Sequence, residues 1–295
     1  MFKRFFKIGI LAVLALITAI PAVSLAGPCD QWPTKLRLGV IPVEGGADTV
    51  ERFKPVTDQL TKILGVPVET VSASDYAGVI TAMAHKNIEF AYLGPKSYTD
   101  AAEKANAQAM VAEMDPSGNP GYYGIIITRK DSGITTMDQA KGKNFAFTDP
   151  NSTSGFLVPN VLFARDMKVK PKEYFKEVKF SGSHGASIVG VHKGTIEVAA
   201  TNNIDLQRAI EKGVCSKDDF NILWTSDLIP GAPMCARADL PENLKAAFAG
   251  ALIQLNSNKA SLEKLSISGY AYTDDKAFDI VRYLKQLKKQ LETEK

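Results

Sequence analysis

Short apolar runs alternate with amphipathic stretches along most of this chain, and this alternation restricts the possible folds more than any other feature. Up to residue 106 it predicts strands and helices in turn, with strands at 36–41, 66–71 and 89–93 and helices at 50–64, 76–85 and 97–106. Strands that alternate with helices at this spacing form a parallel sheet covered by helices on both faces. We therefore expect an α/β fold.

A second α/β series follows a strand at 110–114 and a turn-rich segment at 115–121. Its expected elements are strands at 122–128, 143–148, 177–180, 197–200 and 221–226 and helices at 155–167, 186–193 and 206–212. Another turn-rich join, at 228–233, leads to a helical tail that we expect at 241–255 and 274–290.

The length also favours two lobes, because a single hydrophobic core rarely serves more than about 250 residues. We predict a first lobe from residues 27–119 and 227–295 and a second lobe from residues 120–226. Each lobe would be a mainly parallel sheet flanked by helices. The two turn-rich joins would form the crossings between the lobes and the hinge of a cleft.

Residues 1–26 have the features of a secretory signal peptide. Three basic residues precede an apolar run at 8–23, and small residues at the peptidase positions predict cleavage after Ala26. The alternative is a membrane anchor, but the apolar run is shorter than the ~20 residues of a spanning helix, and Pro21 interrupts its end. We expect a soluble, exported protein.

The charge balance argues against nucleic acid as a partner. The chain has 35 basic and 32 acidic residues. The predicted signal peptide holds three of the basic residues and no acidic one, so the exported protein would be near neutral. Its alkaline isoelectric point is therefore no evidence for binding to nucleic acid or to a membrane surface. If the protein binds an anion, local hydrogen-bond donors must hold it.

The three cysteines leave the disulfide pattern open. Cys215 and Cys235 flank the strand-like run at 221–225 and could form a disulfide in an oxidising compartment. Cys29 would then be free, or it would pair with either of them. With three histidines and no Cys-x-x-Cys string, the sequence predicts no metal site, and we expect no cofactor.

One segment has the pattern of an anion site. Residues 149–159, with the sequence DPNSTSGFLVP, follow a strand-like run and begin a helix. The first N–H groups of a helix lack partners and attract anions, and neighbouring hydroxyls add donors. Here the hydroxyls belong to Ser152, Thr153 and Ser154. The alternative is an ordinary N-cap, because Ser, Thr and Asn are the preferred capping residues.

Five short strings in this order resemble the phosphonate-binding periplasmic proteins of ABC importers, a family that also takes phosphite. They are SDYAG at 74–78, SGNPGY at 117–122, the string at 149–159, ATNN at 200–203 and LIPG at 228–231. The resemblance extends from about residue 36 to about residue 256. It implies a two-lobed periplasmic-binding-protein fold of type II, a phosphorus oxyanion held in the cleft, and delivery of that ligand to a membrane permease and its ATPase.

The resemblance also implies ligand residues, position by position. The cradle for the phosphonyl oxygens would be formed by the hydroxyls and N–H groups of Ser152, Thr153 and Ser154. Tyr76 of the first lobe and Tyr122, just after the first crossing, would each direct a hydroxyl at the ligand, and His184 would add another donor. Without the resemblance, tyrosines beside glycine are more often half-buried core residues, and His184 is more often a surface or capping residue.

Two departures from the family bear on the ligand. Family members that bind aminoalkylphosphonates hold the ammonium group with two carboxylates, but here one position carries the shorter Asp205 and the other carries Ala232. A desolvated ammonium with a single carboxylate would be poorly paired. We therefore expect phosphite or methylphosphonate to bind better than 2-aminoethylphosphonate. Asp205 could instead cap a helix that begins at Leu206.

Two other functions compete with capture of a phosphonate or phosphite. A hydrolase would use Ser, His and Asp, yet the chain has no Gly-x-Ser-x-Gly string and no cluster of metal ligands. A phosphate binder or sensor of the same fold is harder to separate, because phosphate differs from phosphite only by an O–H in place of P–H. An apolar or aromatic wall would reject that hydroxyl, and Tyr92 is a candidate for the wall. We predict a binding protein without catalytic activity.

Overall fold

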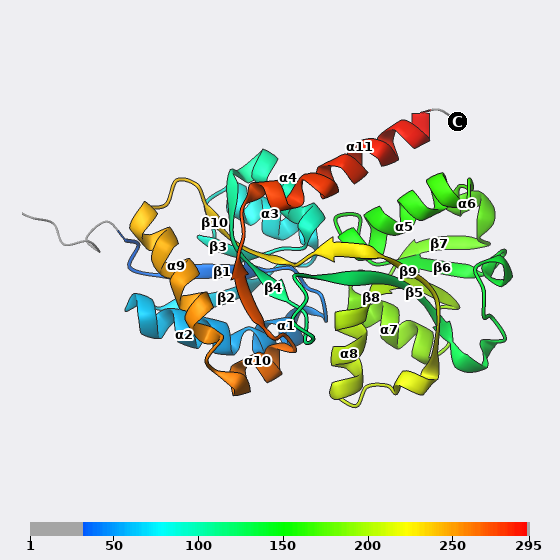
Figure 1. Cartoon of the computed structure of the whole chain (residues 1–295), viewed down its shortest axis with the longest axis horizontal. Coiled ribbons are helices and arrows are strands. Elements are labelled where there is room, and N and C mark those ends of the chain that lie inside the picture. Colours follow the sequence, from blue (N-terminus) through cyan, green and yellow to red (C-terminus); the bar gives the residue numbers. More distant parts are fainter. Residues whose placement is uncertain (1–31, 294–295) are drawn as a thin grey trace, which may run out of the picture. The chain divides into compact units, whose positions relative to one another are not determined.

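Two β-sheets, each flanked by helices, organise the chain (Figure 1). The structure is a computed structural model that describes residues 32–293. The predicted signal peptide, residues 1–26, and Cys29 lie outside the described residues. Within residues 32–293, no helix is both long enough and apolar enough to cross a lipid bilayer.

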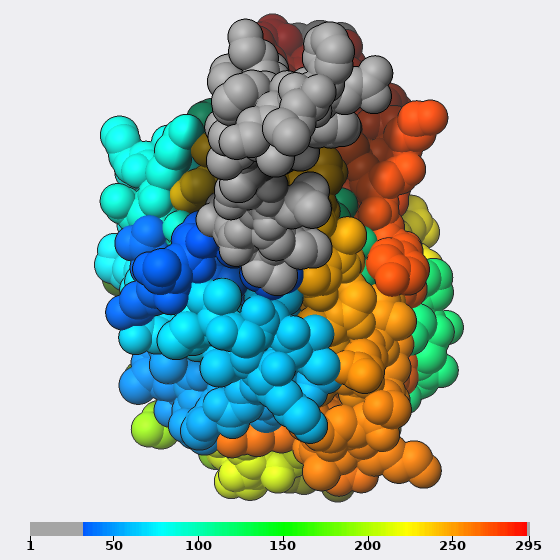
Figure 2. Space-filling view, turned by 90° about the vertical axis from the view of Figure 1, so that its left-hand side faces the viewer, coloured from blue at the N-terminus to red at the C-terminus, as the bar shows by residue number. Residues whose placement is uncertain are grey.

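The first sheet has six strands in the order β11-β4-β10-β3-β1-β2. These strands are β1 (Leu36–Val40), β2 (Val68–Ser72), β3 (Phe90–Tyr92), β4 (Ala107–Met114), β10 (Pro233–Arg237) and β11 (Gly269–Tyr272). The helices of this lobe are α1 (Gly46–Arg52), α2 (Lys54–Leu64), α3 (Tyr76–Ala84), α4 (Pro95–Ala105), α9 (Glu242–Leu255) and α10 (Lys259–Leu265). Figure 2 shows α2 and α9 side by side on the outer face, where Gln59 Nε2 donates to Gln254 Oε1 at 3.1 Å.

The second sheet has five strands in the order β7-β6-β8-β5-β9. They are β5 (Gly121–Arg129), β6 (Asn144–Phe147), β7 (Glu177–Phe180), β8 (Val198–Asn202) and β9 (Phe220–Pro230). The helices are α5 (Val158–Val161), α6 (Pro171–Tyr174), α7 (His184–His192) and α8 (Asn203–Glu211). Two π-helical turns flank α5, at Thr153–Leu157 and Leu162–Asp166, and short 3-10 turns occur at Lys130–Ser132, Asp138–Ala140, Lys217–Asp219 and Asp275–Phe278.

Each lobe has a hydrophobic core of its own, as the length of the chain led us to expect. In the first lobe, Phe90 of β3 stacks on Phe248 of α9 with their ring centroids 3.9 Å apart. The core of the second lobe is built around a cluster of aromatic rings, those of Phe145, Phe147, Phe163 and Phe175. Large aromatic side chains bury much apolar surface, so each lobe gains its stability locally.

Both sheets are mixed, which corrects the expectation of mainly parallel sheets. In the first sheet, β1 pairs in parallel with β2 and β3, but β10 is antiparallel to β3 and β4, and β11 is antiparallel to β4. In the second sheet, β6 is parallel to β7 and β8, whereas β5 is antiparallel to β8 and β9. The strands β5 and β10 each follow directly on a crossing from the other lobe, so no right-handed strand–helix–strand unit of the kind that produces parallel pairs joins them to the strand before.

Segments predicted as turns proved to be parts of strands. The join expected at 228–233 shrinks to Gly231 and Ala232, because β9 extends to Pro230 and β10 begins at Pro233. Proline is tolerated at the ends of strands, where its missing N–H costs no ladder bond. Gly231 is required by close packing, since a Cβ there would lie 2.1 Å from the carbonyl oxygen of Glu113.

The short helix α6, the helix α10 and the strand β11 went unpredicted, and one helix proved to be two. The strand β11 and the helix α10 lie in a region for which the sequence pattern predicted nothing. The helix expected at 50–64 is divided into α1 and α2 at Phe53. Pro55 lies in the first turn of α2, where its missing N–H is tolerated and where it cannot extend the preceding helix.

The chain passes between the sheets at two adjacent crossings. Gly231 donates its N–H to the Pro120 carbonyl at 3.2 Å, and Glu113 donates its N–H to the Ala232 carbonyl at 3.0 Å. The predicted lobe boundaries at 119 and 226 stay a prediction, although the changes of sheet fall between 114 and 121 and between 230 and 233. The last helix, α11 (Asp279–Thr293), packs against both α4 and α5, so it contacts elements of both lobes (Figure 1).

The disulfide considered between Cys215 and Cys235 is wrong. Cys235 is buried in β10 of the first sheet, whereas Cys215 packs against the core of the second lobe, and neither forms a disulfide within residues 32–293. The intervening strand β9 carries the chain from one lobe to the other. It therefore separates the two residues that flank it instead of folding back to bring them together.

Candidate anion-binding site

A small polar cavity lies between the lobes, next to the crossings. Its volume of about 30 Å³ leaves space for roughly two or three water molecules. Six of the seven predicted site residues line it, namely Tyr76, Tyr122, Ser152, Thr153, His184 and Asp205. The seventh, Ser154, is buried beside them, and its Oγ has no partner in hydrogen-bond geometry in the described part of the chain.

Ser152 and Thr153 use their hydroxyl oxygens as acceptors, each from a different direction. Ser152 is the N-cap of the first π-helical turn, and its Oγ accepts the N–H of Gly155 at 3.0 Å. The cap alternative therefore holds for this residue. Thr153 Oγ1 accepts the N–H of Lys96, at the start of α4 in the other lobe, at 2.8 Å. Because this bond occupies the oxygen as an acceptor, the Thr153 proton stays available for a ligand.

Two tyrosines with neutral hydroxyls line the cavity. Burial, reinforced by the nearby carboxylates of Asp205 and Asp149, raises the pKa of Tyr76 well above its usual value. Burial likewise raises the pKa of Tyr122, although the neighbouring hydroxyls of Thr153 and Ser154 partly oppose the shift. The Tyr76 hydroxyl is fully enclosed and has no hydrogen-bond partner within residues 32–293. An unpaired buried hydroxyl is costly, and an anion in the cavity would satisfy it.

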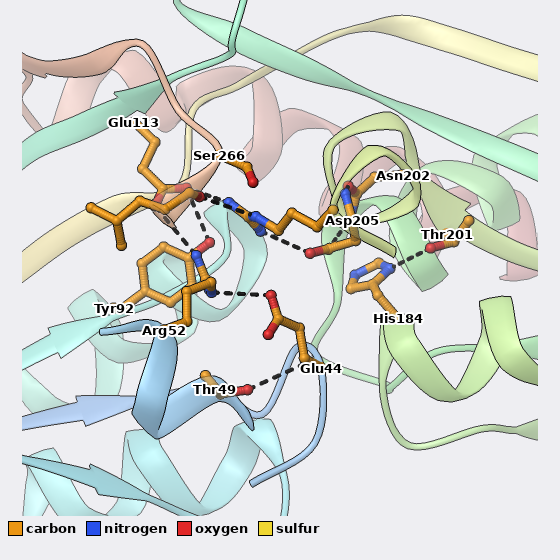
Figure 3. Close-up of polar contacts among 12 residues, drawn as sticks. Glu44, Thr49, Arg52, Tyr92, Glu113, His184, Thr201, Asn202, Asp205 and Ser266 are labelled. Atoms are coloured by element: carbon orange, nitrogen blue, oxygen red, sulfur yellow. Dashed lines mark hydrogen bonds and ion pairs between the residues drawn. The ribbon is translucent and has the colours of Figure 1, made fainter. Parts of the chain in front are cut away.

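His184 lies behind the Ser152 hydroxyl and is neither exposed nor a cap. It is the first residue of α7, and the cap of that helix is Ser183. Its Nε2 is 3.3 Å from Ser152 Oγ, and its Nδ1 is 3.1 Å from Thr201 Oγ1 (Figure 3). Burial lowers the pKa of His184, and Arg208 adds to this effect while Asp205 opposes it. A neutral imidazole with a hydroxyl at each nitrogen orients Ser152 toward the cavity.

Asp205 faces the cavity as part of a helix start, but it is not the cap. The helix α8 begins at Asn203 rather than at Leu206, and its cap is Asn202, which accepts the Asp205 N–H at 2.8 Å. Asn202 Nδ2 in turn donates to Asp205 Oδ2 at 2.7 Å. Burial alone would raise the pKa of Asp205, but Arg208, His184 and Asn202 lower it overall. The carboxylate is therefore ionised.

A buried network of charges beside the cavity was missed by sequence reasoning. Arg208 Nη1 lies 2.8 Å from Asp205 Oδ1, and Arg208 Nη2 lies 4.0 Å from Glu113 Oε2. On the far side, Arg52 Nη1 is 3.9 Å from Glu113 Oε1, and Arg52 Nε is 3.2 Å from Glu44 Oε1 (Figure 3). Arg52, Glu113 and Arg208 are each no more than 3% exposed. Two signals could have revealed the network: Glu113 occupies an inward position of the alternating strand β4, and Arg208 follows Asp205 by three residues on one helix face.

Tyr92, considered as an apolar wall, has a polar role as well. Its ring lines the cavity, while its hydroxyl donates to Glu113 Oε2 at 3.1 Å (Figure 3). Burial raises the pKa of Glu113, although Arg208, Arg52 and the Tyr92 hydrogen bond oppose the shift. Contact between Tyr92 and a P–H group stays a prediction.

The lobes touch each other around the cavity, so the structure is a closed form. Gly185 at the start of α7 donates its N–H to the Val43 carbonyl at 3.0 Å. Lys212 Nζ lies 2.8 Å from Glu44 Oε2, which adds an ion pair across the same boundary. Movement of one lobe away from the other would break both contacts.

Two α/β lobes that are joined by two adjacent crossings and closed over a polar cavity define a solute-binding protein of the periplasmic type. Structural comparison supports this class. A binding protein component of an ABC phosphonate transporter from Pseudomonas aeruginosa superposes with a TM-score of 0.82 at 28% identity, covering 88% of this chain and 87% of that chain. PhnD1 from Prochlorococcus marinus, in complex with methylphosphonate, has a TM-score of 0.78 at 21% identity, and the match covers 86% of this chain and 98% of that chain. Because the identity is low, this match supports the fold alone.

The family follows from the sequence comparison. The sequence model described as "ABC transporter, phosphonate, periplasmic substrate-binding protein" matches residues 38–278, so this chain belongs to that family. The phosphonates-binding periplasmic protein of Escherichia coli is 28% identical over 284 residues, which cover 93% of this chain and 83% of that protein. The phosphate-import protein PhnD of Mycolicibacterium smegmatis is 29% identical over 268 residues, which cover 85% of this chain and 82% of that protein. The expected family and two-lobed fold are confirmed.

Proposed function

We propose that this chain binds a small phosphorus oxyanion, such as phosphite or methylphosphonate, in the cavity between its lobes and delivers it to the permease and ATPase of an ABC importer. The proposal includes export to the periplasm after removal of residues 1–26. The observation that carries it is the convergence of unsatisfied hydroxyl donors on one closed cavity. Among residues 32–293 the Tyr76 and Ser154 hydroxyls have no partner in hydrogen-bond geometry, and the Thr153 and Ser154 hydroxyls lie next to that of Tyr122, while Thr153 Oγ1 accepts from Lys96.

Neutral donors would hold the anion. The buried cations near the cavity already face carboxylates, since Arg208 is paired with Asp205 and Arg52 with Glu44. Hydroxyls and the N–H groups at the start of a helix bind anions without adding net charge, and their hydrogen bonds are stronger in a closed, poorly solvated site. The binding energy then depends on closure, because Tyr76 and Thr153 come from opposite lobes.

We propose capture without chemistry. Ser152 and His184 are in contact, as a nucleophile and its base would be, but the Ser152 oxygen also accepts the N–H of Gly155. The partners of His184 Nδ1 are the hydroxyls of Thr201 and Thr148, where a catalytic triad would use a carboxylate to stabilise the imidazolium ion. This arrangement favours Ser152 as a hydrogen-bond donor to the ligand over Ser152 as a nucleophile.

Calorimetric titration with phosphite, methylphosphonate, 2-aminoethylphosphonate and phosphate tests the proposal. At least one of these anions should bind, and Thr153→Ala combined with Ser154→Ala should weaken it well over tenfold while thermal unfolding stays cooperative. Unchanged affinity in the double variant would refute the site. Tighter binding of phosphate than of phosphite and methylphosphonate would favour the alternative, a phosphate binder, for which the M. smegmatis relative is the precedent.

A further inference from the structure

We infer that Arg208 is a built-in countercation that fills the position an aminoalkyl ligand would need for its ammonium group. This inference rests on the proposed function and specifies the ligand class: a phosphorus oxyanion without a cationic substituent. The observations that lead to it are the placement of Arg208 on the cavity wall, its burial, and its position between the two carboxylates of that wall, Asp205 and Glu113.

The number of carboxylates does not by itself disfavour an ammonium group. From the sequence we counted one, Asp205, because the second family position carries Ala232. The structure adds Glu113, which lines the same cavity and comes from the neighbouring strand, bonded through its N–H to the Ala232 carbonyl. Two buried carboxylates would suit an ammonium group well, so the reason given for excluding 2-aminoethylphosphonate needs correcting.

Arg208 changes this conclusion because it already compensates the two carboxylates. Its Nη1 lies 2.8 Å from Asp205 Oδ1 and its Nη2 lies 4.0 Å from Glu113 Oε2, and Nη2 has no hydrogen-bond partner of its own. Arg52 approaches the opposite oxygen of Glu113 at 3.9 Å. A ligand ammonium placed among these groups would meet two guanidinium ions before it met an uncompensated carboxylate, and like charges repel strongly in a poorly solvated site.

Arg208 is also held in place from both lobes. It belongs to α8 of the second lobe, and its Nε donates to the carbonyl of Leu265, at the end of α10 in the first lobe, at 3.2 Å. A planar guanidinium with two hydrogen-bond partners, Asp205 and Leu265, and a longer ion pair to Glu113 cannot easily rotate away to admit a ligand. The cavity of about 30 Å³ leaves no space for a long substituent while Arg208 stays in place.

The test compares charge and size separately. Wild-type protein is titrated with methylphosphonate, with 2-aminoethylphosphonate and with propylphosphonate, which has the length of the aminoethyl compound but no charge. The Arg208→Met variant keeps an unbranched side chain and removes the guanidinium. Arg237→Met is the matched control, because Arg237 pairs with Asp239 and Glu89 away from the cavity.

We expect wild type and Arg237→Met to prefer methylphosphonate to 2-aminoethylphosphonate by at least tenfold and to bind propylphosphonate more tightly than the aminoethyl compound. In Arg208→Met the preference for methylphosphonate over 2-aminoethylphosphonate should shrink at least tenfold, through a gain in affinity for the charged ligand. If Arg208→Met fails to fold, Arg208→Gln keeps a donor toward Asp205 and serves the same comparison.

Three outcomes would overturn the inference. The first is an unchanged ligand preference in a folded Arg208 variant. The second is that wild type binds 2-aminoethylphosphonate more tightly than methylphosphonate. The third is that wild type binds the aminoethyl and propyl compounds with equal affinity, or binds neither of them. The last result would assign the selection to size alone. Failure of the proposed function looks different, because wild-type protein would then bind no phosphorus oxyanion at all.

Discussion

The N–H of Lys96 donates a 2.8 Å hydrogen bond to Thr153 Oγ1 and thereby joins α4 of the first lobe to the π-helical turn Thr153–Leu157 of the second. The same hydroxyl would donate its proton to a ligand in the cavity. Lobe closure and ligand binding therefore share one side chain. A ligand that fixes this hydroxyl favours the closed state, and closure in turn presents the hydroxyl in the correct orientation.

Replacing Thr153 with valine tests this shared role. Valine keeps the shape of the side chain and removes both the acceptor for Lys96 and the donor to the ligand. We expect affinity for the best anion of the titration panel to fall at least tenfold, since a hydrogen bond to a charged group contributes roughly 1.5–3 kcal/mol and about 1.4 kcal/mol is a factor of ten. The Thr153→Ser variant, which retains the hydroxyl, should stay close to wild type. Equal affinities of the two variants in calorimetry would contradict the role.

The close approach of Gly185 to the other lobe predicts a variant that binds poorly but folds well. A Cβ at Gly185 would lie 2.8 Å from the carbonyl oxygen of Glu44, so Gly185→Ala should prevent full closure. The open form has no such clash, and alanine is a better helix former than glycine. We therefore expect ligand affinity at least tenfold lower, with an unliganded melting temperature equal to or above that of wild type.

Small-angle X-ray scattering provides the second measurement for Gly185→Ala. Wild-type protein should become more compact when saturated with ligand, and the ligand-induced compaction of the variant should be smaller than that of wild type. Gly250→Ala is the control, because a Cβ at that position of α9 has nothing within 4 Å. Normal affinity and normal compaction in Gly185→Ala would show that the closed contact is not needed for binding.

The buried imidazole of His184 predicts a loss of stability in mild acid. Its pKa is lowered in the folded protein, chiefly by burial, from an ordinary value of 6.5. The folded state therefore binds this proton less readily than the unfolded state does. The contribution of His184 is complete above pH 6.5 and is lost progressively as the pH falls toward the lowered pKa.

Urea unfolding at pH 7.5 and pH 5.5 measures this effect. The decrease in the free energy of unfolding between the two pH values should be smaller in His184→Asn than in wild type. His85→Asn, which changes an exposed histidine at the end of α3, should match wild type. An identical decrease in wild type and His184→Asn would rule out the imidazole as the source.

The sequence predicted those features that depend on local pattern. Alternating apolar runs located β1, β6 and β7 almost to the residue, and the hydroxyl-rich string at 149–159 identified the helix start that lines the cavity. Each of these two sequence signals consists of a few consecutive residues. The same locality explains the error at β10, where Pro230 and Pro233 indicated a turn although the chain runs straight from one lobe into the other.

Features that depend on distant partners were beyond the sequence pattern. Glu113 and Arg208 lie in different lobes, and nothing in the chain between them indicates that their side chains converge on one cavity. The antiparallel pairs of β5 with β8 and of β10 with β3 depend on which lobe the chain returns to. Such pairings are decided by tertiary packing, which a single sequence does not display.

The ion pair between Asp205 and Arg208 predicts a large and separable effect on stability. Both groups are buried, so Asp205→Asn leaves the Arg208 guanidinium with only the more distant Glu113 as a counterion. Breaking one side of a buried pair costs roughly 3–5 kcal/mol, mainly through the charge that is left behind. Arg208→Met in the Asp205→Asn background removes that charge and should restore a large part of the loss. Asp239→Asn, which breaks a partly exposed pair with Arg237, should cost no more than about 1 kcal/mol. Urea unfolding of the four proteins of this double-mutant cycle gives the coupling energy, and additive losses would show that the two residues stabilise the fold independently.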